Sequence, residues 1–108
     1  MPAYVIVMVT VDDPEMYRKY TDRTPPTIAR YGGRFLARGE GVQTLEGEPY
    51  EGRLVLLEFP TPENAADWFN DPDYQSAAEF RRAAAAGRFL LIDGESTRPT
   101  RIPRYEQQ

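Results

Sequence analysis

A chain of 108 residues with 41% hydrophobic and 28% charged residues has the size and composition of one globular domain. It contains no cysteine and no histidine, which excludes disulfides, thiolate nucleophiles, zinc–thiolate sites and histidine-ligated haem. The formal net charge of −4 argues against binding to nucleic acid through phosphate neutralisation. We therefore expect no cofactor, no metal and no nucleic-acid partner.

The N-terminal segment gives no sign of a membrane partner. Its apolar stretch covers residues 3–9, far short of the ~20 residues that a membrane-spanning helix needs. No basic residue precedes this stretch, as one would in a signal peptide. Together with the absence of cysteine, this predicts a mature cytoplasmic protein.

Residues 3–11 are rich in β-branched side chains and predict a central strand that is apolar on both faces. Its alternating faces carry Val5, Val7, Val9 and Val11 on one side and Tyr4, Ile6 and Met8 on the other. Helices can cover only one of them. Because the other is too apolar to face water, we expect a homodimer formed through the sheet faces.

A helix is predicted from Pro14, after the capping residues Asp12 and Asp13, with a break or kink at Pro25-Pro26 and an end at Gly32-Gly33. A strand over 34–38, a glycine-containing connection over 39–52 and a strand over 53–59 follow. The second helix is expected from Pro62 to Phe69; it restarts at Pro72 and ends at Gly87, before a last strand over 88–93.

The order βαββαβ predicts an α+β fold: a ferredoxin-like sandwich with a four-stranded antiparallel sheet and both helices on one face. This domain would span residues 1–95. Residues 96–108 form a C-terminal tail that contains arginine and proline. The tail could be a frayed terminus, or an arm over an acidic partner subunit with Ile102 and Tyr105 as anchors.

Several phrases of the sequence resemble domain-of-unknown-function family 1330. They include residues 3–6, the Gly-Gly-Arg-Phe-Leu-Ala-Arg-Gly of 32–39, residues 53–60, and Trp68 followed by Asp-Pro-Asp-Tyr-Gln at 71–75. The resemblance covers about residues 2–95. It implies membership of the dimeric α/β-barrel superfamily, in which two ferredoxin-like subunits bring their sheets together. It implies no reaction, because the family has none assigned.

Within that superfamily, the chain is similar to cofactor-free, quinone-forming monooxygenases, and more distantly to muconolactone-isomerase-like proteins. The monooxygenases place an Asn, a Trp four residues later and a more distant Tyr along the second helix. Asn64, Trp68 and Tyr74 match this pattern. The resemblance implies that Asn64 and Trp68 hold a substrate and that Tyr74 donates a proton. The alternative is a core tryptophan beside a surface amide.

Alternation places Arg34 and Arg38 on one face of their strand, and a hairpin centred near Glu46 would bring Arg34 opposite Glu58. These residues could bind a carboxylate or enolate, with Glu58 as general base, or form only a cross-strand ion pair. We predict that they share a cleft with Trp68, which requires them to lie on the sheet face that meets the helices.

Tyr17 could supply a hydroxyl to the same cleft, or serve as a half-buried amphipathic side chain. The sequence thus indicates a homodimer with a helix–sheet cleft for a small planar or anionic metabolite. Its chemistry would be metal-free isomerisation or cofactor-independent oxygenation. The alternative is a non-catalytic, metabolite-binding or stress-associated module, so the sequence leaves open whether the protein is an enzyme.

Overall fold

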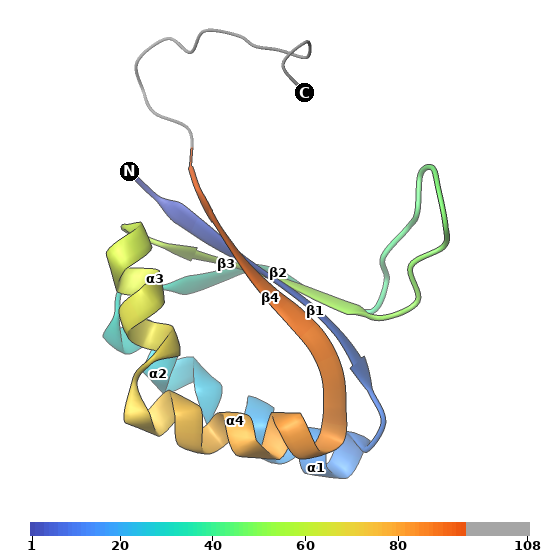
Figure 1. Cartoon of the computed structure of the whole chain (residues 1–108), viewed down its shortest axis with the longest axis horizontal. Coiled ribbons are helices and arrows are strands. Elements are labelled where there is room, and N and C mark those ends of the chain that lie inside the picture. The colour runs from blue at the N-terminus through green and yellow to red at the C-terminus, as the bar shows by residue number, and fades with distance from the viewer. Residues whose placement is uncertain (95–108) are drawn as a thin grey trace, which may run out of the picture.

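Strand β1 (Ala3–Val11) lies at the centre of a four-stranded sheet with β2 (Arg34–Gly39), β3 (Arg53–Phe59) and β4 (Ala85–Asp93) (Figure 1). The strand order is β2-β3-β1-β4, and every neighbouring pair is antiparallel. The predicted ferredoxin-like topology is confirmed. The computed structural model describes residues 1–94, so the predicted tail lies outside the described residues.

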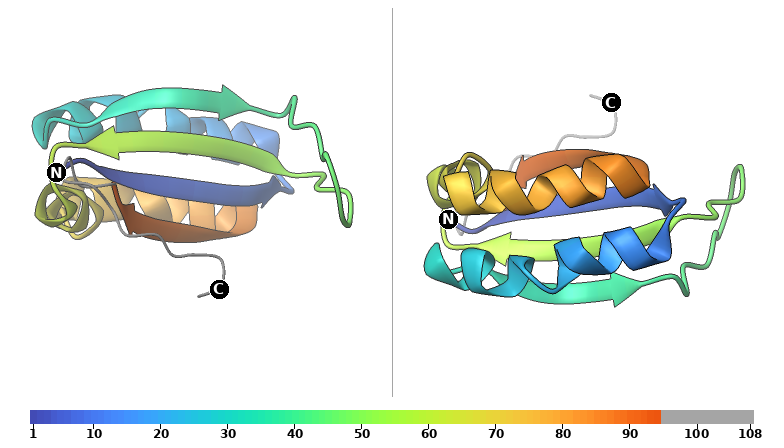
Figure 2. Two further views of the ribbon diagram at one scale, coloured as in Figure 1. Left: turned by 90° about the horizontal axis from the view of Figure 1, so that it is seen from above. Right: turned by 90° about the horizontal axis from the view of Figure 1, so that it is seen from below.

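Four helices cover one face of this sheet: α1 (Pro14–Thr21), α2 (Thr24–Arg30), α3 (Pro62–Phe69) and α4 (Pro72–Ala84). Figure 2 shows α1 and α2 over the half of the sheet that contains β2, and α4 over the half that contains β4. Asp13, Thr61 and Asp71 accept hydrogen bonds from backbone N–H groups at the starts of α1, α3 and α4. Among residues 1–94, no helix is long and apolar enough to cross a membrane.

The predicted break in the first helix is confirmed, whereas the predicted end of the last helix is wrong. The predicted break near Pro25-Pro26 is present, since α2 begins at Thr24 with the prolines in its first turn. The prediction that the last helix continues to Gly87 is wrong. Residues 85–87 pair with Val9, Thr10 and Val11 of β1, so strand pairing outweighs the helix propensity of the alanines.

The inner face of the sheet forms the core with the helices. Val5, Val7 and Val9 are buried there, as are Val55, Leu57 and Phe59 of β3. The outer face is also largely apolar, and no helix of the described chain covers it (Figure 2). It carries Tyr4, Ile6, Met8, Leu54, Leu56, Leu90 and Ile92. Both faces of β1 are therefore apolar, as the alternation predicts.

A β-bulge at Leu36 changes which residues of β2 face the helices. Arg34 pairs with Glu58, as predicted, and Phe35 pairs with Leu57. Ala37, not Leu36, then pairs with Leu56, and Arg38 pairs with Val55. One extra residue reverses the alternation. The prediction that Arg34 and Arg38 share a face is therefore wrong: Arg34 lies on the outer face and Arg38 on the inner face.

The start of α4 is tied to the end of α2 through Asp71. Its carboxylate accepts hydrogen bonds from the Tyr31 hydroxyl (2.6 Å), the Arg30 guanidinium (3.0 Å) and the backbone N–H groups of Asp73 and Tyr74 (2.7 and 3.2 Å). The Tyr31 hydrogen bond, supported by the backbone N–H groups and Arg30, holds the pKa of Asp71 below its ordinary value although burial opposes this.

Gly33→Ala should destabilise the fold by about 1–3 kcal/mol, because overpacking a core has a cost of this order. A β-carbon at Gly33 would lie 2.5 Å from Cε2 of Phe59 and 2.9 Å from Cγ2 of Ile28. Urea unfolding measures the effect. Gly41→Ala is the control, since no atom lies within 4 Å of its added carbon. Equal stability of the two variants would contradict the packing.

Asp71→Asn should lower the free energy of unfolding at neutral pH and make it less dependent on pH in the acid range. A carboxyl whose pKa is lowered on folding stabilises the protein above its unfolded pKa, and this stabilisation is lost as pH falls through the folded pKa. The difference between wild type and variant should thus shrink below about pH 3.8. Urea unfolding across pH tests this, with exposed Glu79→Gln as control. A constant difference across pH would show that the charge is irrelevant.

Candidate functional site

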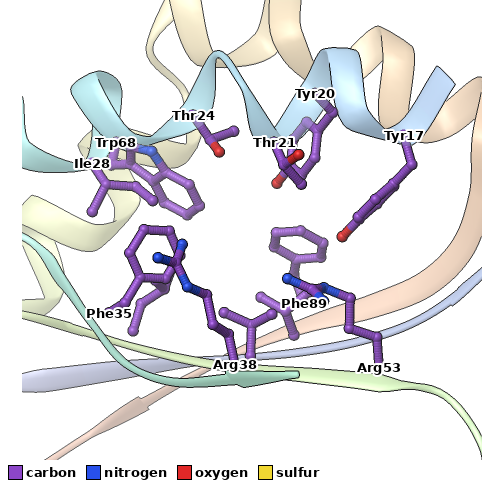
Figure 3. A pocket seen from close by; sticks show the side chains of 13 residues that line it. Tyr17, Tyr20, Thr21, Thr24, Ile28, Phe35, Arg38, Arg53, Trp68 and Phe89 are labelled. Atoms are coloured by element: carbon purple, nitrogen blue, oxygen red, sulfur yellow. The ribbon is translucent and has the colours of Figure 1, made fainter. Parts of the chain in front are cut away.

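A cavity lies between the α1–α2 pair and the inner face of the sheet (Figure 3). Its volume is about 450 Å³, counting its open mouth. Much of the wall is aromatic: Phe35 and Phe89 from the strands, Tyr17 and Tyr20 from α1, and Trp68 from α3. The remaining wall is aliphatic, hydroxyl or guanidinium: Val7, Thr21, Thr24, Ile28, Arg38, Arg53, Val55 and Leu57. A flat ring would find apolar contacts on several sides.

Two arginines bring positive charge to this wall. Figure 3 shows Arg38 and Arg53 rising from the strand side into the cavity. The Arg38 guanidinium carbon lies 4.0 Å from the centroid of the Phe35 ring, and that of Arg53 lies 6.0 Å from the centroid of Tyr17. The buried Nε of Arg53 has no hydrogen-bond partner within residues 1–94. No carboxylate is among the residues that line the cavity, so its electrostatic character is positive.

The hydroxyl groups of the cavity come mainly from the helices. Figure 3 shows Tyr17 extending from α1 with its hydroxyl directed toward Arg53. Burial raises the pKa of Tyr17, and the positive charge of Arg53 partly offsets this. Burial also raises the pKa of Tyr20, whose hydroxyl oxygen lies 3.0 Å from that of Tyr74. Both cavity phenols therefore stay protonated at neutral pH and can donate hydrogen bonds.

Trp68 contributes its ring to the cavity, while its polar group is already bonded. The indole N–H donates to Oγ1 of Thr27 at 3.1 Å, and that hydroxyl donates to the carbonyl of Thr24 at 2.7 Å. The side chain is 1% exposed. Trp68 can therefore offer a ligand its apolar surface, with the N–H committed to holding α3 against α2.

A second hollow adjoins the cavity, with which it shares Tyr17 and Thr21 as lining residues, and it reaches Glu40 at the start of the β2–β3 connection. Arg18, Glu40 and Pro14 line this outer hollow, together with Arg38 and Arg53, which also line the cavity itself. Three arginines and one glutamate thus line this hollow. An approaching anion would meet a positive potential there.

The structure brings together only part of the predicted site. Arg38, Trp68 and Tyr17 line the cavity. Arg34 and Glu58 lie on the outer face, where Nε of Arg34 donates to Oε1 of Glu58 at 2.8 Å, so they are separated from Trp68 by the sheet. The predicted cleft containing both arginines and Glu58 is wrong, because the bulge at Leu36 directs only Arg38 inward.

The other two predicted residues do not line the cavity. Asn64 lies in the first turn of α3, where its backbone N–H donates to Oγ1 of Thr61 at 3.0 Å. Tyr74 is completely buried, and its ring centroid lies 4.3 Å from that of Trp68. Its hydroxyl contacts the hydroxyl of Tyr20, and it is Tyr20 that lines the cavity.

Several lining residues were not predicted as site residues. Arg53 carried a usable signal, because alternation with Val55 and Leu57 places it on the same strand face as these buried residues. Phe35 faces inward because it precedes the bulge, and Phe89 pairs with Val7. No glycine marks the bulge, so nothing in the local sequence distinguishes this strand from a regular one.

The arrangement suits an organic anion better than a metal ion. Within the part of the chain that the structure describes, no group of three or more Asp or Glu side chains is placed to hold a metal. Two guanidinium groups, two phenols and three further aromatic rings instead surround one cavity. Such a wall can hold an oxyanion by charge-assisted hydrogen bonds and pack against a planar ring.

Comparison with solved structures supports the fold. The chain is 21% identical to a protein of unknown function from Rhodopseudomonas palustris, with a TM-score of 0.72 over 88% of this chain and 83% of that one. SnoaB, a cofactor-independent oxygenase from Streptomyces nogalater, is 17% identical, with a TM-score of 0.63 over 92% and 98%.

A dimeric protein of unknown function with a ferredoxin-like fold, from Bacteroides fragilis, is 11% identical, with a TM-score of 0.58 over 86% of this chain and 96% of that one. At these identities the similarity concerns the fold. No curated protein matches the chain. A family model, Domain of unknown function (DUF1330), matches residues 2–95. The chain therefore belongs to the DUF1330 family.

Proposed function

We propose that the cavity between α1–α2 and the sheet binds a small planar organic anion, such as an aromatic carboxylate, phenolate or enolate. The observation that carries this proposal is the pair Arg38 and Arg53, which face an aromatic cavity whose lining residues include no carboxylate. The Nε atom of Arg53 is buried without a hydrogen-bond partner within residues 1–94, which is unfavourable, whereas Arg38 is exposed and brings its charge to the open side of the cavity. An anionic ligand would supply the missing charge and accept the free N–H groups.

The shape of the cavity supports a flat ligand. Phe35, Phe89 and Trp68 offer aromatic surfaces, and Arg38 is itself held over the Phe35 ring. A planar ligand would replace water against these surfaces while its oxyanion lies between the arginines. Apolar contact would then supply affinity, and the arginines would supply orientation and selection for negative charge.

The chemistry that fits this wall is metal-free and begins from an enolate or phenolate. Positive charge beside an enolisable or phenolic group favours its anionic form. For a substrate that enters as its enolate, Tyr17 could donate its proton to carbon to give the keto tautomer, and water would then reprotonate the Tyr17 phenolate beside Arg53. An oxygenase reaction would instead pass the electrons of the anion to dioxygen. The cofactor-independent activity named for SnoaB, which shares the fold, supports this second route.

Binding without turnover is the second candidate function. It is favoured by the composition of the wall, since the cavity lining contains no carboxylate to act as a general base. Glu58 cannot take that role from the outer face, and Tyr74 is separated from the cavity by Tyr20.

Incubation of the protein with an enolisable aromatic ketone in deuterated water distinguishes the two candidate functions. Catalysed deuterium uptake at carbon supports an enzyme, whereas binding without exchange supports a carrier.

Arg38→Ala and Arg53→Ala should each weaken the binding of 2-naphthoate by about tenfold or more, because a hydrogen bond to a charged group contributes about 1.5–3 kcal/mol. Isothermal titration calorimetry measures this. The uncharged amide, 2-naphthamide, should bind weakly to all proteins and respond little to either substitution.

Arg34→Ala is the matched control, since Arg34 lies on the same strand as Arg38 but on the outer face. It should leave 2-naphthoate binding unchanged. Loss of binding in the Arg34 variant alone, or equal affinity of wild type for the acid and the amide, would overturn the proposed site.

We also propose that the protein is a homodimer joined through the outer face of the sheet. This face carries exposed Leu90 and Ile92 beside half-buried Ile6 and Met8, and a fold neighbour is described as dimeric. Burial of this patch against a second copy would remove the apolar side chains from water.

Ile6→Glu should convert the dimer to a monomer, because it places a charge at the centre of the apolar outer face. Light scattering at micromolar concentration reports the mass. Leu45→Glu is the control, since Leu45 is 91% exposed in the β2–β3 connection and should not affect assembly. A wild-type protein of monomer mass would contradict the proposal.

A further inference from the structure

Arg81 is a buried cation behind the cavity wall. It lies near the end of α4, is 8% exposed and forms no ion pair within residues 1–94. Its guanidinium carbon lies 4.3 Å from the centroid of Phe89 and 5.6 Å from that of Tyr20, both of which line the cavity. Its hydrogen bond in the described chain goes from Nη2 to the hydroxyl of Tyr74, at 3.5 Å.

The Arg81 contact and the burial of Tyr74 together favour one direction for the neighbouring hydroxyl hydrogen bond. Arginine can only donate, so the Tyr74 oxygen is an acceptor toward Arg81. The Tyr74 hydroxyl lies 3.0 Å from that of Tyr20; among the described residues Tyr20 has no other hydrogen-bond partner for its hydroxyl, and Tyr74 has none besides Arg81. Tyr74 is completely buried, so its own proton would remain unbonded unless it is donated to Tyr20. The favoured order therefore runs from Arg81 to Tyr74 to Tyr20.

In that order, the proton of Tyr20 has no acceptor in the described protein. Tyr20 is also the member of the series that lines the cavity, and Figure 3 shows it on the helix side, across from Arg38 and Arg53. The free hydroxyl is thus left where a ligand can use it. Burial raises the pKa of Tyr20, which keeps this proton in place at neutral pH.

We propose that Tyr20 is a ligand-binding hydrogen-bond donor and that Arg81 is a positioning residue that keeps the Tyr20 proton directed to the cavity. This inference rests on the proposed function and names the ligand class more closely. The ligand is a planar anion whose charge lies between Arg38 and Arg53. On its opposite edge it carries a hydrogen-bond acceptor, such as a carbonyl oxygen, which bonds to Tyr20.

Two pairs of probes isolate the contact with Tyr20. One pair is 3-acetylbenzoate and 3-isopropylbenzoate, and the other is 4-acetylbenzoate and 4-isopropylbenzoate. Each acetyl compound has the charge and nearly the shape of its isopropyl partner, and adds a carbonyl acceptor. Calorimetry with wild type should show tighter binding of at least one acetyl isomer, by about tenfold over its isopropyl partner. Tyr20→Phe should abolish this preference, so that the two compounds of a pair bind with about equal affinity.

Arg81 is tested by Arg81→Gln and Arg81→Lys. A glutamine amide can accept as well as donate, so Tyr74 is no longer forced to donate to Tyr20, and the acetyl preference should fall at least threefold. Lysine only donates and should restore most of the preference. A merely structural role for Arg81 would change the affinity for both compounds together and leave their ratio intact.

Arg38→Ala serves to separate this inference from the proposed function. It should weaken both acetyl and isopropyl compounds and leave their ratio unchanged. If wild type binds neither class, the proposed function fails. If wild type binds both classes equally and Arg38→Ala weakens both, the proposed function stands and the role of Tyr20 is overturned. If Arg81→Gln does not fold, Tyr20→Phe still decides the donor, and retention of the acetyl preference in that variant overturns the inference.

Discussion

The packing of Trp68 connects α2, α3 and α4 to the sheet beside the cavity. Its ring centroid lies 5.3 Å from that of Phe59 on β3 and 4.3 Å from that of Tyr74 on α4, and its N–H donates to Thr27 on α2. One side chain thus joins three helices and the sheet. Because the indole also lines the cavity, the shape offered to a ligand is set by the same contacts that hold the core together. The site has little freedom to change shape without a cost in stability.

The order of elements could be predicted from the sequence because each depended on a local signal. Capping residues followed by proline marked the helix starts, and the alternation of β1 identified a strand with two apolar faces. The site was predicted less well, since it depends on which side chains of the short strand β2 face the helices. Leu36 adds a single residue to β2, and this suffices to separate Arg34 from Arg38. The extra residue is specified by pairing with β3, which no pattern within β2 reveals. Arg53 shows the opposite case, since its inward direction follows directly from alternation along β3.

The distribution of acidic and basic groups in this chain is uneven. The protein carries a net charge of −4, yet Arg38, Arg53 and Arg81 gather in or behind one cavity whose lining has no acidic residue. Arg34 on the outer face has Glu58 as a partner, and Arg30 has Asp71 and Asp73. Aromatic contact does not separate the two groups of arginines, since Arg23, away from the cavity, lies over the Phe80 ring as Arg38 lies over that of Phe35. The proposed ligand site is supported instead by the gathering of arginines at a cavity whose lining has no carboxylate to pair with them.

Helix α4 passes into β4 without an intervening loop, since Ala84 ends the helix and Ala85 begins the strand. Arg81 lies three residues before this junction, and Phe89, which its guanidinium contacts, lies four residues after Ala85. The short connection keeps Arg81 and Phe89 close along the chain as well as in space. Because Phe89 lines the cavity and also contacts Arg81, a substitution at this one position changes both the cavity wall and the surroundings of the buried cation on α4.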